Sequence, residues 1–227
     1  MPKDRIEDRF ADVWRKRNRI QPEITNNCVD NDWAKGRNQF LTFLIKIKDE
    51  KVIQKITKVQ DKLSTFPCVD PFPKDYLHIT VKGCGFLREF EIYEDDILIG
   101  NLQKIVSQAE EVLRTFHKFN VLLPRLNIFS NVVLVEVHDG GKIGELNKGL
   151  QAILEIKKMK FDYPILLPHI SIAQFQNNQE FARLINCLEE LRETEFGDLT
   201  VNCIELVNAH LSGKYPTLKT IHSLELK

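Results

Sequence analysis

Two histidines in this sequence begin the same short pattern. His78 opens "HITV" and His169 opens "HISI", so each imidazole is followed two positions later by a hydroxyl, on Thr80 or Ser171. Alternating apolar residues around both predict β-strands, in which residues i and i+2 share a face. Each strand is therefore expected to present an imidazole and a hydroxyl on one side. The same alternation places Lys82 on the face of His78.

Two imidazoles and two hydroxyls that meet in one cleft are suited to phosphoryl chemistry. One histidine can take a proton from the attacking water or hydroxyl, while the other gives a proton to the leaving oxygen. The hydroxyls of Thr80 and Ser171 can hydrogen-bond the non-bridging phosphate oxygens. This chemistry requires no metal or other cofactor, and no H-E-x-x-H pattern is found in the sequence. The alternative for either motif alone is a core histidine on a half-buried strand.

Other features allow a functional and a structural interpretation. Tyr76 and Phe175 flank the two motifs and could stack a nucleobase, although packing in the core or at its rim is the commoner role of aromatic side chains. Six lysines between Lys46 and Lys62 predict a solvated basic helix face, with an RNA-guiding patch as the alternative.

Composition limits the class of protein. The 227 residues include 32 basic and 32 acidic side chains, and 43% are hydrophobic, which is typical of a soluble globular protein. Such a balanced chain lacks the positive field that grips long nucleic acid, so we expect no DNA partner, although a local patch could still bind a nucleotide or a short RNA end. Five cysteines without C-x-x-C spacing predict reduced thiols and no zinc site. With no apolar signal core or membrane-length segment, we expect a cytoplasmic monomer without membrane contact.

The chain is expected to contain an appendage and a duplicated body. Apolar residues recur at helical spacing over 4–17, and an Asn- and Asp-rich stretch follows, so residues 1–36 are expected to pack on the body. A disordered arm is the alternative, which Trp14 and Trp33 disfavour. The body is expected to contain strands at 39–47, 75–83, 131–141, 164–175, 199–211 and 217–226, and helices at 49–66, 95–116, 143–156 and 180–193. This strand–helix alternation runs twice, with one histidine strand in each pass.

The paired motifs resemble those of the two-histidine (2H) phosphoesterase superfamily, which includes the RNA 2′,3′-cyclic phosphodiesterases, also called 2′-5′ RNA ligases. The resemblance covers about residues 37–227, and "HITVKGCGFL" resembles the first family motif with its glycine-containing turn. It implies an α+β fold with two pseudo-symmetric lobes, each an antiparallel sheet backed by helices, and an active site in the cleft between them. We expect the lobes at roughly 37–125 and 126–227, with possible strand exchange. The resemblance also implies that His78 and His169 are the catalytic pair.

One residue departs from the family pattern. The ligase-type branch often carries a basic residue shortly after the second motif, where this sequence has Gln174. Lys82 is then the expected source of the phosphate-binding cation. The expected activity is metal-independent hydrolysis of 2′,3′-cyclic phosphates of nucleotides or RNA ends. Cleavage or ligation of a 2′-5′ phosphodiester is one alternative, and a non-catalytic module that binds an AMP-like nucleotide is another.

Overall fold

A computed structural model describes residues 6–24 and 31–227 of the chain. The α-helices are α1 (Ile6–Arg15), α2 (Asn31–Ala34), α3 (Glu50–Leu63), α4 (Leu102–Leu113), α5 (Lys142–Gln151) and α6 (Phe181–Leu191). Three short 3₁₀ turns are η1 (Arg17–Arg19), η2 (Lys74–Tyr76) and η3 (Ile99–Asn101). The strands are β1 (Gln39–Lys46), β2 (Val69–Pro71), β3 (His78–Arg88), β4 (Asp96–Leu98), β5 (Phe119–Leu123), β6 (Leu126–Ile128), β7 (Val132–Glu136), β8 (His169–Phe175), β9 (Gly197–Val201), β10 (Cys203–His210) and β11 (Thr217–Glu225).

Most of these strands belong to one sheet. Its order is β11-β10-β1-β3-β8-β7-β6, with β4 paired to β3 and β2 paired to β8, while β5 and β9 form a separate two-stranded sheet. All pairings are antiparallel except that between β3 and β4. The mixture of helices and antiparallel strands confirms the expected α+β class.

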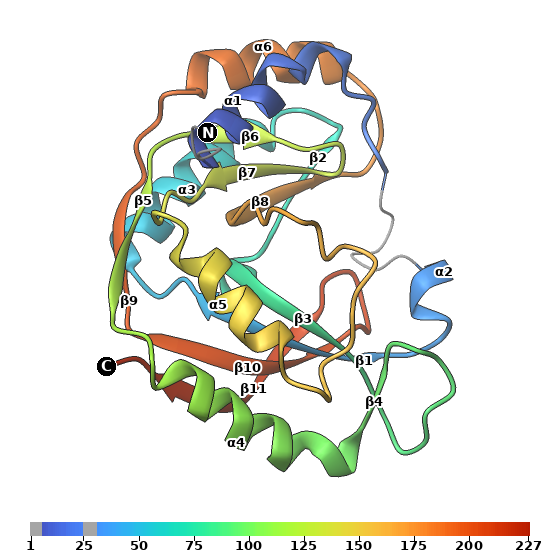
Figure 1. The fold of residues 1–227 in the computed structure, drawn as a ribbon. Helices are drawn as coiled ribbons and strands as arrows, with labels where there is room; N and C mark the ends of the chain where they lie inside the picture. Colours follow the sequence, from blue (N-terminus) through green and yellow to red (C-terminus); the bar gives the residue numbers. More distant parts are fainter. Residues whose placement is uncertain (1–5, 25–30) are drawn as a thin grey trace.

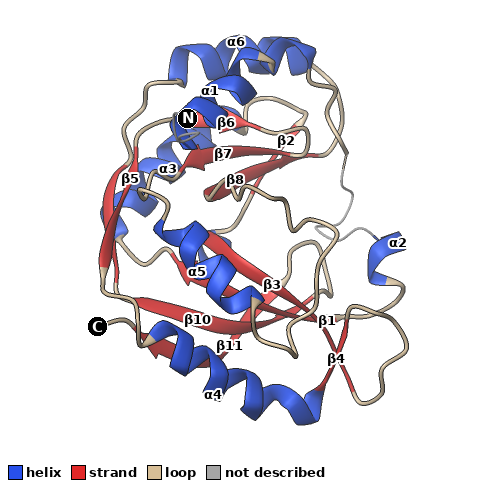
Figure 2. Cartoon of the chain, viewed as in Figure 1, coloured by secondary structure: helices blue, strands red, loops and turns tan. Residues whose placement is uncertain are grey.

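The sheet is divided into two lobes at the junction of β3 and β8. These strands pair only through Ile79 and Ile170, so the two groups of strands diverge on either side of this point. In the first lobe, helices α4 and α5 pack on the strands β11, β10, β1 and β3; in the second, α1, α3 and α6 pack around β2, β6, β7 and β8. Figure 1 shows these two groups one above the other. Figure 2 shows α1 and α6 above the second group of strands and α4 below the first, while α5 lies across β3 in the middle of the view.

The two lobes interleave the two halves of the chain. Helix α3 follows β1 in sequence but packs on β2 and β8 of the second lobe, whereas α5 follows β7 but packs on β3 of the first. Strands β10 and β11, from the C-terminal end, complete the sheet beside β1. A boundary near residue 125 therefore does not separate the lobes. The elements that pack in the lobe of the other half of the sequence include helices as well as strands.

Helix α3 forms where the sequence supplies both an apolar face and a start signal. In α3, the side chain of Asp49 accepts a hydrogen bond from the Val52 backbone N–H at 2.9 Å, which caps the first turn. The apolar face of that helix is buried in the main core through Val52, Ile56, Val59 and Leu63. The expected helix at 95–116 differs, because residues 96–98 form β4 and α4 begins only at Leu102.

The N-terminal segment packs on the body through α1. Phe10 is completely buried, and the Asn127 side chain donates a hydrogen bond to its backbone carbonyl at 3.0 Å. Residues 1–5 and 25–30 of the expected appendage, including Cys28, lie outside the described residues. The other four cysteines are free thiols. Across 6–24 and 31–227, no helix has the length and apolar character needed to cross a bilayer.

Candidate active site

Both motif histidines stand at the beginning of a strand, at the junction of the two lobes. His78 opens β3 and His169 opens β8. Because β3 and β8 run antiparallel and meet at the single pair Ile79–Ile170, the sequence neighbours of that pair lie where the strands meet: His78 and Thr80 on β3, and His169 and Ser171 on β8. The fold therefore places the four motif side chains together on neighbouring strands.

The two imidazoles are oriented by the same device. Nδ1 of His78 lies 2.5 Å from the carbonyl oxygen of Tyr76, and Nδ1 of His169 lies 2.8 Å from that of Leu167, in each case two residues earlier. A carbonyl oxygen only accepts hydrogen bonds, so each Nδ1 carries a proton and donates it. Nε2 of each neutral ring is then the nitrogen that can accept a proton. This is the tautomer that acid–base chemistry at Nε2 requires.

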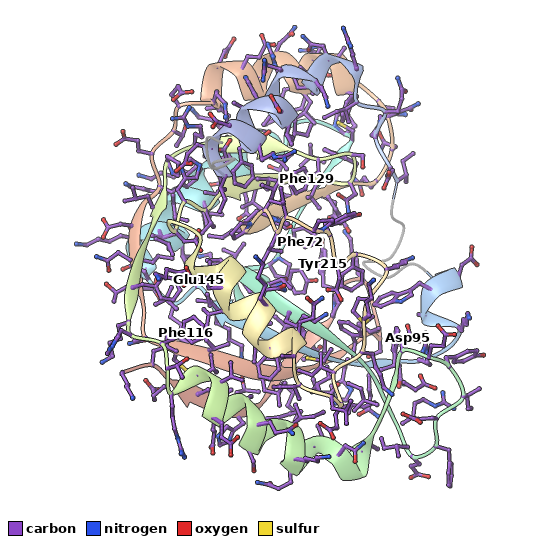
Figure 3. All side chains as sticks on the ribbon, viewed as in Figure 1. Phe72, Asp95, Phe116, Phe129, Glu145 and Tyr215 are labelled. Carbon is purple, nitrogen blue, oxygen red and sulfur yellow. The ribbon has the colours of Figure 1, made fainter. Side chains whose placement is uncertain are left out.

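An aromatic ring also holds each imidazole from the side. The Tyr76 ring stands perpendicular to His78 with centroids 5.0 Å apart, and the Phe129 ring meets His169 at 5.1 Å and 83°. Tyr76 is on the same segment as its histidine, whereas Phe129 comes from the turn between β6 and β7. Figure 3 labels Phe129 near the second group of strands. The two rings limit rotation of both imidazoles.

Burial lowers the pKa of both histidines. For His78, burial is the main cause, and the neighbouring His169 and Lys46 add to it; together they outweigh the Tyr76 carbonyl and lower the pKa to about 4. Burial also lowers the pKa of His169, against the opposing effect of the Leu167 carbonyl. Lys46 is the cross-strand neighbour of His78 on β1 and forms an ion pair with Glu205. Both rings are therefore predominantly neutral at pH 7 before an anionic ligand binds.

A pocket of about 210 Å³ opens beside these groups. It is lined by Phe72, Tyr76, His78, Thr80, Asn131, Val132, Ser171 and Gln174. Three of the four motif residues thus line one pocket, and His169 opens the adjoining strand β8, where it is close enough to His78 to lower its pKa. Tyr76 lines the pocket as well, so base stacking by Tyr76 remains a prediction.

Lys82 was expected to face the pocket, and this prediction is wrong. Thr80 pairs with Leu44 of β1, but Lys82 pairs with Phe43, so Val81 forms a bulge that reverses the alternation. Lys82 consequently leaves the face of His78. Its side chain is fully buried, and its ammonium donates to Asp162 at 2.5 Å in the loop after α5. Lys82 holds that loop and does not contact the pocket.

A second bulge explains the other incorrect prediction, base stacking by Phe175. On β8, Ser171 pairs with Leu134 and Ala173 with Val133, so Ile172 is the extra residue. Beyond this bulge Phe175 points into the core, where it is completely buried and packs edge-on against Phe181 at 5.2 Å. The same reversal turns Gln174 towards the pocket. The bulges follow the two motifs at the same position.

A family model described as the 2′-5′ RNA ligase superfamily matches residues 47–212, which include both motifs. The chain belongs to this superfamily. The resemblance to the two-histidine phosphoesterases is thereby confirmed.

Individual relatives agree with this assignment to the 2′-5′ RNA ligase superfamily. An RNA 2′,3′-cyclic phosphodiesterase of Methanothermobacter thermautotrophicus is 24% identical over 184 residues, which cover 77% of this chain and 92% of the relative. A crystal structure from Thermus thermophilus matches with a TM-score of 0.64 and 19% identity, over 82% of this chain and 97% of the other. The E. coli LigT structure in complex with 3′-AMP matches with a TM-score of 0.58 and 15% identity, over 84% and 99%. These structures show a shared fold.

Several residues around the superfamily motifs were not found by sequence reasoning. Phe72, Asn131 and Val132 also line the pocket, but no local pattern shows that an apolar or amide side chain at these positions faces a pocket. Asp70 on β2 was also missed, although its carboxylate accepts a hydrogen bond from Gln174 at 2.8 Å. The described residues contain no group of three or more His, Cys, Asp or Glu side chains that could hold a metal ion.

Proposed function

We propose that this protein is a metal-independent phosphoesterase that hydrolyses 2′,3′-cyclic phosphates of nucleotides or RNA ends. The observation that carries the proposal is the matched orientation of His78 and His169. Each donates its Nδ1 proton to a backbone carbonyl, which reserves Nε2 for proton exchange with a ligand. Thr80 and Ser171 stand beside them as hydroxyl donors.

The proposed reaction needs two proton transfers. One neutral imidazole takes a proton from water as the water oxygen attacks phosphorus. The bond from phosphorus to one ribose oxygen breaks, and the second imidazole, protonated at Nε2, gives its proton to that oxygen. The products are a phosphomonoester and a free ribose hydroxyl, and the two histidines have exchanged protonation states.

The hydroxyls and pocket supply the other requirements. The hydroxyls of Thr80 and Ser171 can donate to the non-bridging oxygens, whose charge grows as water attacks. An anionic phosphate beside the histidines raises the pKa of an imidazole, which favours the protonated form of the acid. The name of the M. thermautotrophicus relative, a 2′,3′-cyclic phosphodiesterase, supports this choice of substrate.

The proposal is tested by incubating the full chain with each of the four 2′,3′-cyclic nucleotides in excess EDTA. We expect monoester formation, absent in a His78→Ala, His169→Ala double variant. Turnover that EDTA abolishes and a divalent cation restores would overturn the mechanism. Binding of 3′-AMP without any turnover would instead indicate a nucleotide-binding module.

A further inference from the structure

The pocket that contains the motif hydroxyls has no cationic lining. Of the described residues that line it, none is lysine or arginine, and Lys82 is committed to Asp162. A phosphodiester carries a negative charge, and phosphate sites in proteins usually supply a cationic side chain beside their hydroxyl donors. A cation from an element outside this lining would complete the site.

Asp70 links a residue that lines the pocket to such a cation through hydrogen bonds. One of its carboxylate oxygens accepts from the side-chain amide of Gln174 at 2.8 Å. The other accepts from the Lys214 ammonium at 2.5 Å and from the Tyr215 hydroxyl at 2.7 Å. A single carboxylate therefore separates Lys214 from a residue that lines the pocket.

The carboxylate is charged and well satisfied. Burial alone would raise the pKa of Asp70, but its bonds to Lys214, Gln174 and Tyr215 outweigh burial and hold the pKa below its usual range. Its negative charge is shared among three donors. Lysine has three N–H groups, and the Lys214 side chain is 54% exposed, so it can bind Asp70 and a ligand oxygen together.

Lys214 reaches this position from the other lobe. It lies in the loop between β10 and β11, and that loop contacts β2 through Asp70 and the backbone carbonyl of Pro71. The Tyr215 ring packs edge-on against Phe72, with centroids 5.7 Å apart, and Phe72 lines the pocket. Figure 3 shows Phe72 and Tyr215 close together between the two groups of strands. The loop thus spans the lobes at the margin of the site.

We propose that Lys214 binds a phosphate oxygen of the substrate and sets the affinity of the site for anionic phosphate. Asp70 and Tyr215 act as positioning residues, because they fix the ammonium one carboxylate away from Gln174, which lines the pocket, and reduce the entropy lost when the ammonium binds a ligand. The inference rests on the proposed function for its substrate, and Lys214 and Tyr215 lie just beyond the segment that matches the family model. It also assigns the missing cation beside Gln174.

Lys46 is the competing candidate. It lies beside His78 on β1, but its ammonium donates to Thr220 at 2.7 Å and pairs with Glu205 at 3.2 Å, and its side chain is only 23% exposed. Two partners on neighbouring strands hold it within the sheet. The Lys214 side chain is the more exposed of the two, and it is held by Asp70, whose other oxygen bonds the pocket residue Gln174.

The test compares binding and turnover. Inorganic phosphate is titrated into the full-length protein by calorimetry, and 2′,3′-cyclic AMP turnover is followed at several salt concentrations. For Lys214→Met we expect a Kd for phosphate and a KM about tenfold higher, with kcat changed less than threefold. The dependence of KM on salt should weaken as well, because one charge contact is lost. Lys214→Arg should stay within about threefold of wild type.

A matched control is available on the same hairpin. Lys219 is exposed on β11, and Lys219→Met should behave like wild type in every measurement. Unchanged phosphate affinity and salt dependence in Lys214→Met, or a larger loss in Lys46→Met, would overturn the inference. A wild-type protein that binds phosphate through Lys214 but hydrolyses no cyclic nucleotide would overturn the proposed function and leave this inference standing.

Discussion

The strands β3 and β8 carry the same local design in different surroundings. Each begins with a histidine whose Nδ1 is bound to the carbonyl two residues earlier, continues with a hydroxyl, and then bulges at the fourth residue, Val81 or Ile172. The similarity therefore extends beyond the sequence pattern to the hydrogen bonding and the interruption of the strand. The repeated unit is the motif together with its bulge.

The strands differ after the bulge. On β3 the bulge sends Lys82 into a buried ion pair and leaves Gly83 against the rings of Phe40 and Phe161. On β8 the corresponding reversal buries Ala173 and turns Gln174 to the pocket. The repeated motif supplies the reacting groups on both strands. The residues after it support the structure on β3, through Lys82, and line the pocket on β8, through Gln174.

The electrostatic surroundings differ too. The pKa of His78 is lowered by burial, by His169 and by Lys46, whereas burial is the cause of the lowered pKa of His169. Lys46 is thus among the causes of the lowered pKa of His78 but not of His169, so the two imidazoles respond to different neighbours.

The strongest test of the equivalence of the two strands is removal of each imidazole. His78→Ala and His169→Ala should each lower kcat at least 100-fold, because a general acid or base typically contributes 10²–10⁴. The double variant should be little worse than the poorer single variant, since the two act in one reaction step. Turnover of 2′,3′-cyclic AMP measures this, with the exposed His117→Ala as control. Near-normal turnover in either single variant would mean that its strand is structural only.

Loss of a motif hydroxyl should have a smaller effect. Thr80→Ala and Ser171→Ala each remove one donor to a phosphate oxygen, at a cost on the order of 2–4 kcal/mol in the transition state. The free energy of unfolding should change little, because both side chains border the pocket. Steady-state kinetics and urea denaturation of the same samples separate the two effects. If either variant unfolds instead, that hydroxyl is structural, and the two strands differ in role.

Gly85 offers a way to weaken β3 without touching either motif. It has φ of +146°, and a Cβ there would lie 2.6 Å from the backbone oxygen of Asp95, next to β4. Gly85→Ala should therefore lower the unfolding free energy by about 2 kcal/mol through strain and overpacking. In α5, no neighbouring atom lies within 4 Å of a Cβ added to Gly144, so Gly144→Ala should stabilise by up to about 1 kcal/mol. Urea denaturation that ranks these two variants in the opposite order would contradict this account.

The pH dependence should reveal the lowered histidine pKa values. In the free protein the base must be neutral and the acid protonated, so kcat/KM rises through the pKa of the base and falls through that of the acid. Because both values lie below 6.5, the maximum of kcat/KM should lie below pH 6.5. Bound phosphate raises the pKa values of both histidines, so the maximum of kcat should lie at higher pH than the maximum of kcat/KM. The apparent pKa values of the two limbs of this profile belong to the coupled histidine pair and not to either residue alone.

A full pH series of kcat/KM, repeated with Lys46→Met, checks the stated cause. Loss of the Lys46 charge should raise the pKa of His78 and move the limb of the profile that His78 sets to higher pH by less than about one unit, because burial is the largest cause of the lowered pKa. A wild-type maximum above pH 7 in kcat/KM would show that the two environments do not lower these pKa values.

The sequence was sufficient to predict the reacting groups, because a spacing of two residues fixes the face of a strand directly. His78 and Thr80 share a face for that reason, as do His169 and Ser171. The positions of Lys82 and Phe175 were predicted incorrectly because each lies beyond a bulge. A bulge depends on the register with a neighbouring strand, here β1 or β7, and that register is not encoded in the local pattern.

In the rest of the fold, too, the sequence predicts an element only where a local pattern indicates it. Long elements with a strong period, such as α3 and β1, are found close to their expected ranges. The three-residue strands β2, β4 and β6 are too short to carry a period, and they form because longer strands provide partners. The contact of Lys214 with Asp70 joins residues 144 positions apart, so no local pattern indicates it.

The interleaved lobes also determine the order in which a growing chain can acquire structure. Strand β1 is made early, yet one of its edges pairs with β10, and the side chains of Gln39 and Asn208 that bond across this edge are 169 residues apart. During synthesis this edge stays open, with unpaired N–H and C=O groups, until β10 has left the ribosome. Because contacts so distant in sequence also slow folding, the first lobe is completed last. We therefore expect the nascent chain to depend on chaperones that cover exposed strands until β10 is released.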